Sequence, residues 1–205
     1  MRFMKPALAL SAVLTVAACG HMPISTMISL RNFDFARFDP AQLHIAARSP
    51  DWLETRPGGA KLSVSVWAEG REKEKTTEVF VLAENNTVQE MASLARFRAA
   101  GTRILAYRVA DADVSRVRAM QEQGRTNQPG SSQKKHIGIE IEIDSCRRGE
   151  MPAGPVLSTT YLKPDAQTPY LVFLADVDLK KAIADAGKNL EATIPPCGKI
   201  AARAN

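Results

Sequence analysis

Apolar and polar residues alternate along most of the chain after residue 28. In residues 136–144 (HIGIEIEID) every second residue is isoleucine, and the residues between are histidine, glycine or acidic. Such alternation is typical of a β-strand with one buried face and one face in water. Similar patterns predict strands over residues 28–35, 42–49, 61–70, 76–84, 156–164 and 169–176. The chain therefore contains five to eight short strands.

Turn residues separate these predicted strands. Residues 57–59 (Pro-Gly-Gly) predict a connection between neighbouring strands, the charged residues 70–75 a hairpin loop, and residues 163–169 (KPDAQTP) another turn. Short strands with frequent turns favour antiparallel pairing. The predicted fold class is mainly β: an antiparallel β-sandwich or open barrel with one or two helices packed on it.

Residues 86–101 break the alternation. Thr87 is followed three residues later by Glu90, which is the spacing of a capping box, and Gly101 is placed to end the helix. The pattern favours a helix. The alternative is a strand over residues 94–98 that forms a hairpin with the next segment.

Residues 111–124 (DADVSRVRAMQEQG) predict a second helix. Asp111 or Asp113 is suited to cap it, valine and methionine recur at helical spacing, and Gly124 is expected to end it. Residues 176–187 predict a shorter helical turn.

Composition agrees with a globular protein. The chain has 205 residues, of which 45% are hydrophobic and 24% charged. The formal net charge is +5, and Arg2 and Lys5 contribute two of these charges. No dense Lys/Arg block with interleaved aromatic residues occurs, so nucleic acid is not expected as a partner.

The first residues have the features of a signal peptide. Arg2 and Lys5 form a basic start, residues 7–16 are apolar, and Ala17 and Ala18 are small residues suited to a protease site. A membrane-spanning helix needs roughly 20 apolar residues, so this run is too short to be one. Residues 1–18 are therefore predicted to be removed on export.

Val16-Ala17-Ala18-Cys19 resembles the lipobox of bacterial lipoproteins. The resemblance covers the signal region alone. It implies cleavage between Ala18 and Cys19, a diacylglyceryl group on the Cys19 sulfur and a fatty acyl group such as palmitate on the new amino terminus. The lipid bilayer would then be a partner through acylated Cys19, because two or more acyl chains anchor a protein stably. The alternative is an ordinary secretory peptide that leaves Cys19 a plain thiol.

The segment after the anchor predicts where the protein lies. Residues 19–27 form a short tether that keeps a β-rich globular domain, residues 28–205, close to the membrane. Gly20, in place of Asp, resembles the sorting signal of Gram-negative lipoproteins for the outer membrane. The predicted location is the cell envelope, with the domain facing the periplasm.

The chain has three cysteines. If Cys19 is lipidated, Cys146 and Cys197 are the only pair that remains, in a compartment that permits disulfides. The loop that they would close has about 50 residues, for which the chain-entropy model gives about 4 kcal/mol. The alternative is two buried free cysteines.

The acidic residues Glu140, Glu142 and Asp144 are expected on one face of a strand. Oxygen clusters suit calcium, but such a ladder usually marks a solvated face with basic residues on the neighbouring strand. The second interpretation is favoured. The candidate basic partners are Arg103, Arg108, Lys134 and Lys135.

The sequence contains no recognised catalytic motif. His21, His44 and His136 do not have the spacing of a metal site, and no nucleophile elbow or phosphate-binding glycine loop occurs. No metal or cofactor is predicted, and an enzyme is disfavoured without being excluded.

These observations favour a non-catalytic binding or assembly module that meets a protein or a glycan at the envelope. Two alternatives remain. One is an envelope hydrolase whose site converges from loops such as residues 124–135 and 149–156. The other is a carrier of an apolar ligand, which requires a dry cavity in the β core.

Overall fold

The computed structural model describes residues 38–125 and 134–198. The predicted signal peptide, Ala18 and Cys19 of the lipobox, the tether and the predicted strand over residues 28–35 lie outside the described residues. Among the described residues, no helix is both long and apolar enough to cross a membrane.

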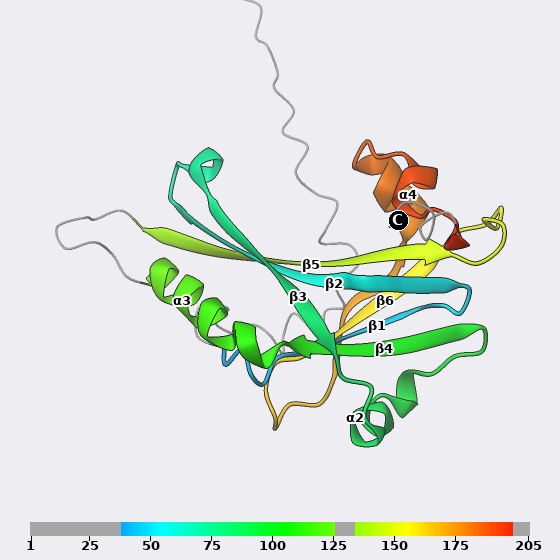
Figure 1. The fold of residues 1–205 in the computed structure, drawn as a ribbon, viewed down its shortest axis with the longest axis horizontal. Helices are drawn as coiled ribbons and strands as arrows, with labels where there is room; N and C mark the ends of the chain where they lie inside the picture. The colour runs from blue at the N-terminus through cyan, green and yellow to red at the C-terminus, as the bar shows by residue number, and fades with distance from the viewer. Residues whose placement is uncertain (1–37, 126–133, 199–205) are drawn as a thin grey trace, which may run out of the picture.

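Seven strands in the described part of the chain form one antiparallel sheet in the order β5-β2-β3-β4-β1-β6-β7 (Figure 1). The strands are β1 (His44–Pro50), β2 (Leu53–Ala68), β3 (Thr76–Glu84), β4 (Thr102–Val109), β5 (Lys135–Arg147), β6 (Leu157–Lys163) and β7 (Leu171–Asp178). The prediction of a mainly β fold is confirmed.

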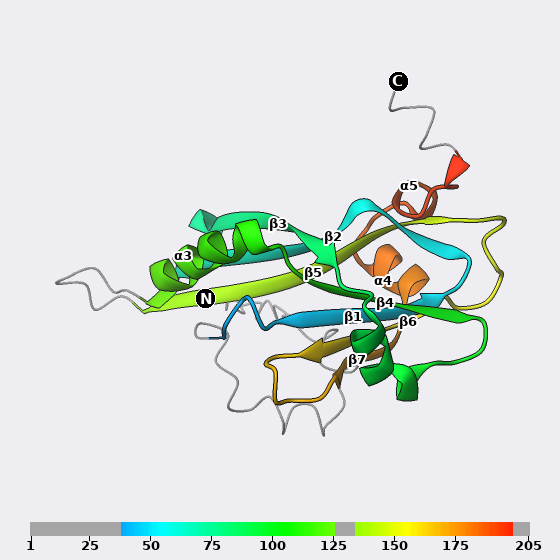
Figure 2. The ribbon, with the colours of Figure 1, turned by 60° about the horizontal axis from the view of Figure 1, so that its bottom comes forward.

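The sheet curls into a half-barrel because β3 changes partner along its length. Residues 76–81 of β3 pair with β2, and residues 82–84 pair with β4. The two parts of the sheet therefore turn toward each other around β3, as Figure 2 shows from below. Of the two predicted architectures, the open barrel describes this single curled sheet. Among the residues that the structure describes, β5 and β7 lie at its two edges.

The prediction of a connection at residues 57–59 is wrong. These residues lie inside β2, where the register against β5 shifts between Thr55 and Ala60. A Cβ atom on Gly59 would lie 2.6 Å from the carbonyl oxygen of Asp144, so only glycine allows this approach. Proline and glycine are used for a bulge as well as for a turn, and a bulge bends a strand.

Helical segments lie on both faces and at one end of the sheet. The α-helices are α2 (Val88–Ser93), α3 (Val114–Arg125), α4 (Leu179–Asp185) and α5 (Leu190–Thr193), and the short 3-10 turns are η2 (Glu72–Glu74), η3 (Ala95–Phe97) and η4 (Asp111–Asp113). Helices form near residues 88, 114 and 179 as predicted, and η2 lies in the predicted hairpin loop. The prediction that Gly101 ends the first helix is wrong, because α2 ends at Ser93 and Gly101 lies in the turn before β4.

The start of α2 has the predicted cap. The amide of Glu90 donates to Oγ1 of Thr87 at 3.3 Å. The alternative of a strand over residues 94–98 is wrong, because Leu94 is buried under this helix and the residues after it form η3.

Two details of α3 differ from the prediction. Gly124 lies inside the helix, and a Cβ atom there would lie 2.2 Å from Cγ1 of Ile137. This glycine therefore allows close packing of α3 on β5. The helical segment starts with η4, which has Ala110 at its N-cap position and no side-chain cap, and Asp113 accepts from Nη1 of Arg116 at 2.8 Å.

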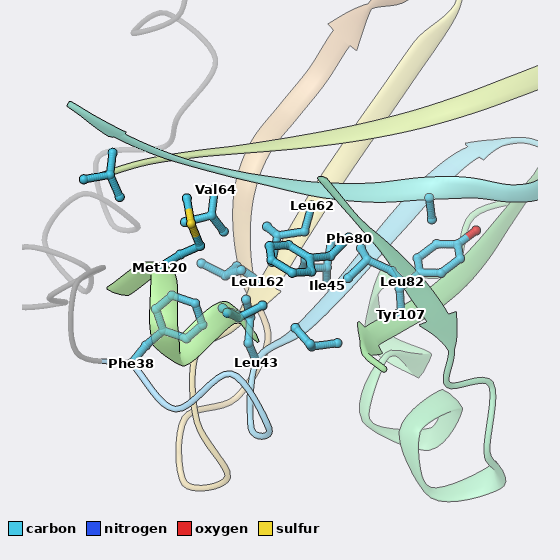
Figure 3. Packing of buried hydrophobic residues seen from close by; sticks show 14 residues of the cluster. Phe38, Leu43, Ile45, Leu62, Val64, Phe80, Leu82, Tyr107, Met120 and Leu162 are labelled. Atoms are coloured by element: carbon cyan, nitrogen blue, oxygen red, sulfur yellow. The ribbon is translucent and has the colours of Figure 1, made fainter. Parts of the chain in front are cut away.

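The main core fills the concave face of the half-barrel (Figure 3). Ile45, Leu62, Phe80 and Tyr107 are almost fully buried there, and Met120 of α3 covers one end of the face. Each apolar side chain of this size contributes about 1.5–3 kcal/mol to folding when buried. This face therefore supplies most of the stability of the sheet.

Two smaller clusters hold the remaining helices. On the convex face, α2 packs over Ala46, Ala106 and Tyr161. At the end opposite α3, the helices α4 and α5 pack over β2 and β5 through a third cluster (Leu53, Val156 and Ile194, with Leu179, Ile183 and Leu190). The sulfurs of Cys146 and Cys197 lie at disulfide distance at this end, with Cα atoms 4.9 Å apart. The predicted pairing of these two cysteines thus agrees with the structure.

Candidate functional site

Two adjoining cavities lie on the concave face, between edge strand β5 on one side and β6 and β7 on the other. Their volumes are about 130 Å³ and about 180 Å³, and Ile141 lines both. We call these two cavities together the inner trough. Figure 1 shows α3 at one end of the half-barrel and α4 at the other, and Leu179 of α4 lines the second cavity.

The first cavity is lined by apolar residues. They come from the segment before β1 and from strands β5, β6 and β7: Phe38, Leu43, Ile137, Ile139, Ile141, Leu162 and Phe173. Because none of these side chains offers a polar ligand a hydrogen bond, this end of the trough suits an apolar group.

The second cavity mixes apolar and hydroxyl side chains. Leucine, isoleucine, valine and alanine line most of it, and five hydroxyl residues face it as well: Ser49, Thr55, Ser145, Ser158 and Thr160. Ser145 and Thr55 are directly opposite each other on β5 and β2, while Ser49 lies at the end of β1. The trough is therefore apolar at the α3 end and partly polar at the α4 end.

The trough exists because the edge strands are incompletely covered. Ile137, Ile139, Ile141 and Ile143 of β5 are only partly buried, although they face the core. Phe173 of β7 is partly buried too. Among the described strands, β5 and β7 each pair with one neighbour, and these strands do not close the sheet between them. Apolar side chains that face one another across such an opening form a ready site for an apolar ligand.

The acidic ladder lies on the opposite, convex face of β5. Nζ of Lys61 lies 2.7 Å from Oδ2 of Asp144, and this hydrogen bond raises the pKa of Lys61. Lys61 also stands opposite Glu142 in the register of β2 against β5. The expected solvated face therefore has its basic partner on the neighbouring strand.

The four basic residues named from the sequence were the wrong candidates for this role. Arg108 pairs with Asp111, and Nζ of Lys135 donates to the carbonyl oxygen of Gln123. Arg103 projects from the other face of the sheet, and no contact joins Lys134 to the ladder. Sequence alternation gives the face of a strand, but not which strand becomes its neighbour.

A second polar group gathers on the convex face under α2. Nδ1 of His44 lies 3.0 Å from Oε1 of Glu90, and Nζ of Lys163 lies 3.9 Å from the same oxygen. The hydroxyl of Tyr170 is buried beside them. We call these four residues the Glu90 cluster. No local pattern indicates this cluster, because its members are brought together from β1, α2, β6 and the residue before β7.

The electrostatics of the Glu90 cluster favour the ionised carboxylate. Burial pushes the pKa of Glu90 upward, but His44, the nearby Tyr170 hydroxyl and Lys163 outweigh it and hold that pKa below its ordinary value. Burial and the Glu90 carboxylate raise the pKa of Tyr170. The Tyr170 hydroxyl does not reach hydrogen-bond geometry with any described residue, so it acts as a nearby dipole.

The Glu90 cluster has the residue types of a catalytic site but fastens α2 to the sheet. None of its members lines the inner trough. Glu90 is 7% and Tyr170 2% exposed, which leaves no room for a substrate between them. We therefore assign the cluster a role in stability.

The other residues singled out from the sequence do not converge on the trough. The ring of His136 stacks on Trp67 at 5.6 Å on the convex face, and His21 lies outside the described residues. Neither cavity of the trough is lined by a residue of the segments 124–135 and 149–156, as far as these are described.

The hydroxyl residues that line the trough were not among the site residues predicted from the sequence. A signal for them exists, because Ser49, Ser145 and Thr160 occupy positions that the alternation assigns to the core face.

Comparison of the chain with known protein families, with curated proteins and with solved structures finds no match.

Proposed function

We propose that this protein is an exported lipoprotein, anchored through acylated Cys19, whose half-barrel is a non-catalytic binding module for a ligand with a hydrocarbon chain. The observation that carries the proposal is the inner trough: an apolar cavity between two edge strands, continued by a second cavity at its polar end. The sequence supports the anchor, through the lipobox that ends at Cys19.

The size of the trough supports a small ligand or one acyl chain of moderate length. The first cavity, about 130 Å³, is comparable with engineered cavities of about 150 Å³ that bind benzene. With the second cavity, about 180 Å³, the trough reaches the lower end of the range of about 300–1,000 Å³ that small-molecule sites occupy.

The energetics also favour a chain over a compact polar ligand. Each methylene group that leaves water for an apolar site contributes about 0.8 kcal/mol. Association costs at least about 4 kcal/mol, so a chain of several carbons is needed for net binding. A glycan would leave its hydroxyl groups without partners in the first cavity, which disfavours it as the occupant of the trough.

The anchor would determine where in the cell envelope this module lies. A tether of residues 19–27 would hold the trough close to the bilayer, where amphiphiles are concentrated. By resemblance to lipoprotein sorting, Gly20 directs the protein to the outer membrane with the domain in the periplasm. A ligand that leaves or enters the membrane would meet the trough there.

The experiment that tests the proposal is titration of the purified mature protein with N-phenylnaphthylamine, whose fluorescence rises in apolar surroundings. We expect saturable binding. Ile141→Trp should reduce it at least tenfold, because Ile141 lines both cavities and a larger ring fills them. The matched control is Val79→Trp, which places the same ring at a 53% exposed position of the convex face.

Two results would contradict the proposal. One is the absence of saturable binding by the wild-type protein. The other is equal binding by Ile141→Trp and by Val79→Trp, since the dye would then bind outside the trough.

A further inference from the structure

The hydroxyl groups at the α4 end of the trough differ in whether they are already used. Thr55 accepts from the hydroxyl of Tyr107 at 3.0 Å, and Ser158 donates to the carbonyl oxygen of Arg48 at 3.3 Å. The side chains of Ser49, Ser145 and Thr160 form no hydrogen bond with any described residue. Three hydroxyl groups that line a cavity are therefore free to donate to a ligand.

An arginine stands beside these hydroxyl groups. In the register of β1 against β4, Arg103 is directly opposite Ser49, so both side chains emerge on the concave face. The charge of Arg103 also acts on Tyr107, which donates to Thr55 of the trough. The register therefore places Arg103 next to Ser49, just outside the lining of the second cavity.

The guanidinium of Arg103 is also unpaired in the described part of the chain. It forms no ion pair or hydrogen bond there, whereas Arg48 and Arg147 are paired with Asp176 and Glu191. Arg103 is only partly exposed. A partly buried cation without a partner attracts an anion more strongly than a fully solvated one does.

We propose that the ligand of the trough is a single-chain carboxylate, a free fatty acid of moderate length, with its head group at Arg103. This inference rests on the proposed function and specifies the head group that the trough selects. Three free hydroxyl groups and a guanidinium all donate hydrogen bonds, and a carboxylate only accepts them. An ammonium head would be repelled at the same place.

The two ends of the trough fix the direction of the ligand. The carboxylate lies at Ser49 and Thr160, and the chain runs past Ile141 into the apolar cavity, where Phe38 and Phe173 enclose its end. The opposite direction would bury the charge among hydrocarbon side chains, which is strongly unfavourable.

The test compares three probes with the same ten-carbon chain: decanoate, decanol and decyltrimethylammonium. Each displaces N-phenylnaphthylamine from the full mature protein. We expect decanoate to bind at least about tenfold more tightly than decanol, since hydrogen bonds to a charged group contribute about 1.5–3 kcal/mol. Decyltrimethylammonium should bind more weakly than both.

Arg103→Gln should weaken decanoate binding far more than decanol binding, so that the preference for decanoate is lost. Arg103→Lys keeps the positive charge and should retain part of the preference. The matched control is Arg98→Gln, which removes an exposed arginine after η3, outside the trough lining. Ellipticity in the far ultraviolet verifies that each variant is folded.

The outcomes separate this inference from the proposed function. If decanol and decanoate bind equally, and Arg103→Gln changes neither, the carboxylate assignment is wrong while the apolar site stands. If none of the three probes displaces the dye, both are wrong. This failure of all three probes is the result expected if another segment of this chain, or a second copy of it, fills the trough in place of a ligand.

Discussion

Glu90 offers a quantitative test of how the half-barrel is held together. Its side chain is 8% exposed and accepts from Nδ1 of His44 at 3.0 Å, and the Lys163 ammonium lies 3.9 Å from the same oxygen. Glu90→Gln keeps the volume and removes the charge. A buried hydrogen bond to a charged group contributes about 1.5–3 kcal/mol, so we expect the free energy of unfolding to fall by about 2 kcal/mol.

The effect should depend on pH. Because the folded protein holds the pKa of Glu90 below its ordinary value, the unfolded chain takes up the proton first as the pH falls. The stabilisation is therefore complete above the ordinary pKa of about 4.3 and is lost as the pH falls through the lower pKa of the folded state. The difference between wild type and Glu90→Gln should shrink toward about pH 3.

The assay is urea unfolding followed by tryptophan fluorescence, at about pH 7 and at several lower values. Glu140→Gln is the matched control, because Glu140 is exposed on the convex face; it should change the free energy of unfolding by less than about 0.5 kcal/mol. A loss for Glu90→Gln no larger than that of the control, or a loss that grows in acid, would refute the assignment of a buried ionised carboxylate.

Three further predictions concern the anchor, the disulfide and the bulge. Cys19→Ser should abolish lipid incorporation and release the protein from membranes, and unchanged retention in a membrane pellet would contradict the anchor. Reduction of the Cys146–Cys197 pair, which closes a loop of 51 residues, should lower the free energy of unfolding by about 4 kcal/mol, and alkylation without reductant should label neither cysteine. Gly59→Ala should cost at least about 2 kcal/mol, because the new methyl group meets two backbone carbonyl oxygens, whereas Gly154→Ala, with open space around it, should be nearly neutral; equal melting temperatures for the two variants would argue against the bulge.

Local patterns predicted most elements of this fold. The isoleucine alternation in β5 and the Thr87 cap of α2 depend on neighbours along the chain, and both appear as expected, although the Glu90 side chain pairs with His44. The error at residues 57–59 has a physical reason. Proline and glycine indicate that the backbone departs from a regular strand, but a turn and a bulge need the same conformational freedom. Only the pairing with β5 decides between them.

The candidate site was beyond the reach of local patterns. The core face of β5 was predicted, but not that its isoleucines would remain partly uncovered, since this depends on how far the sheet closes. The position of Arg103 opposite Ser49 depends on the pairing of β1 with β4, strands that more than fifty residues separate along the chain. Residues that meet only through strand pairing leave no signal in sequence spacing.

The most direct test of the central claim is to locate the bound chain on the protein. Decanoate with a photoreactive diazirine near its methyl end would be irradiated with the mature protein, and the modified residues identified by mass spectrometry. We predict adducts on β5 and β7, at Ile139, Ile141 and Phe173. Adducts on the convex face at Val79 and Val81, or labelling that excess decanoate does not reduce, would contradict the account.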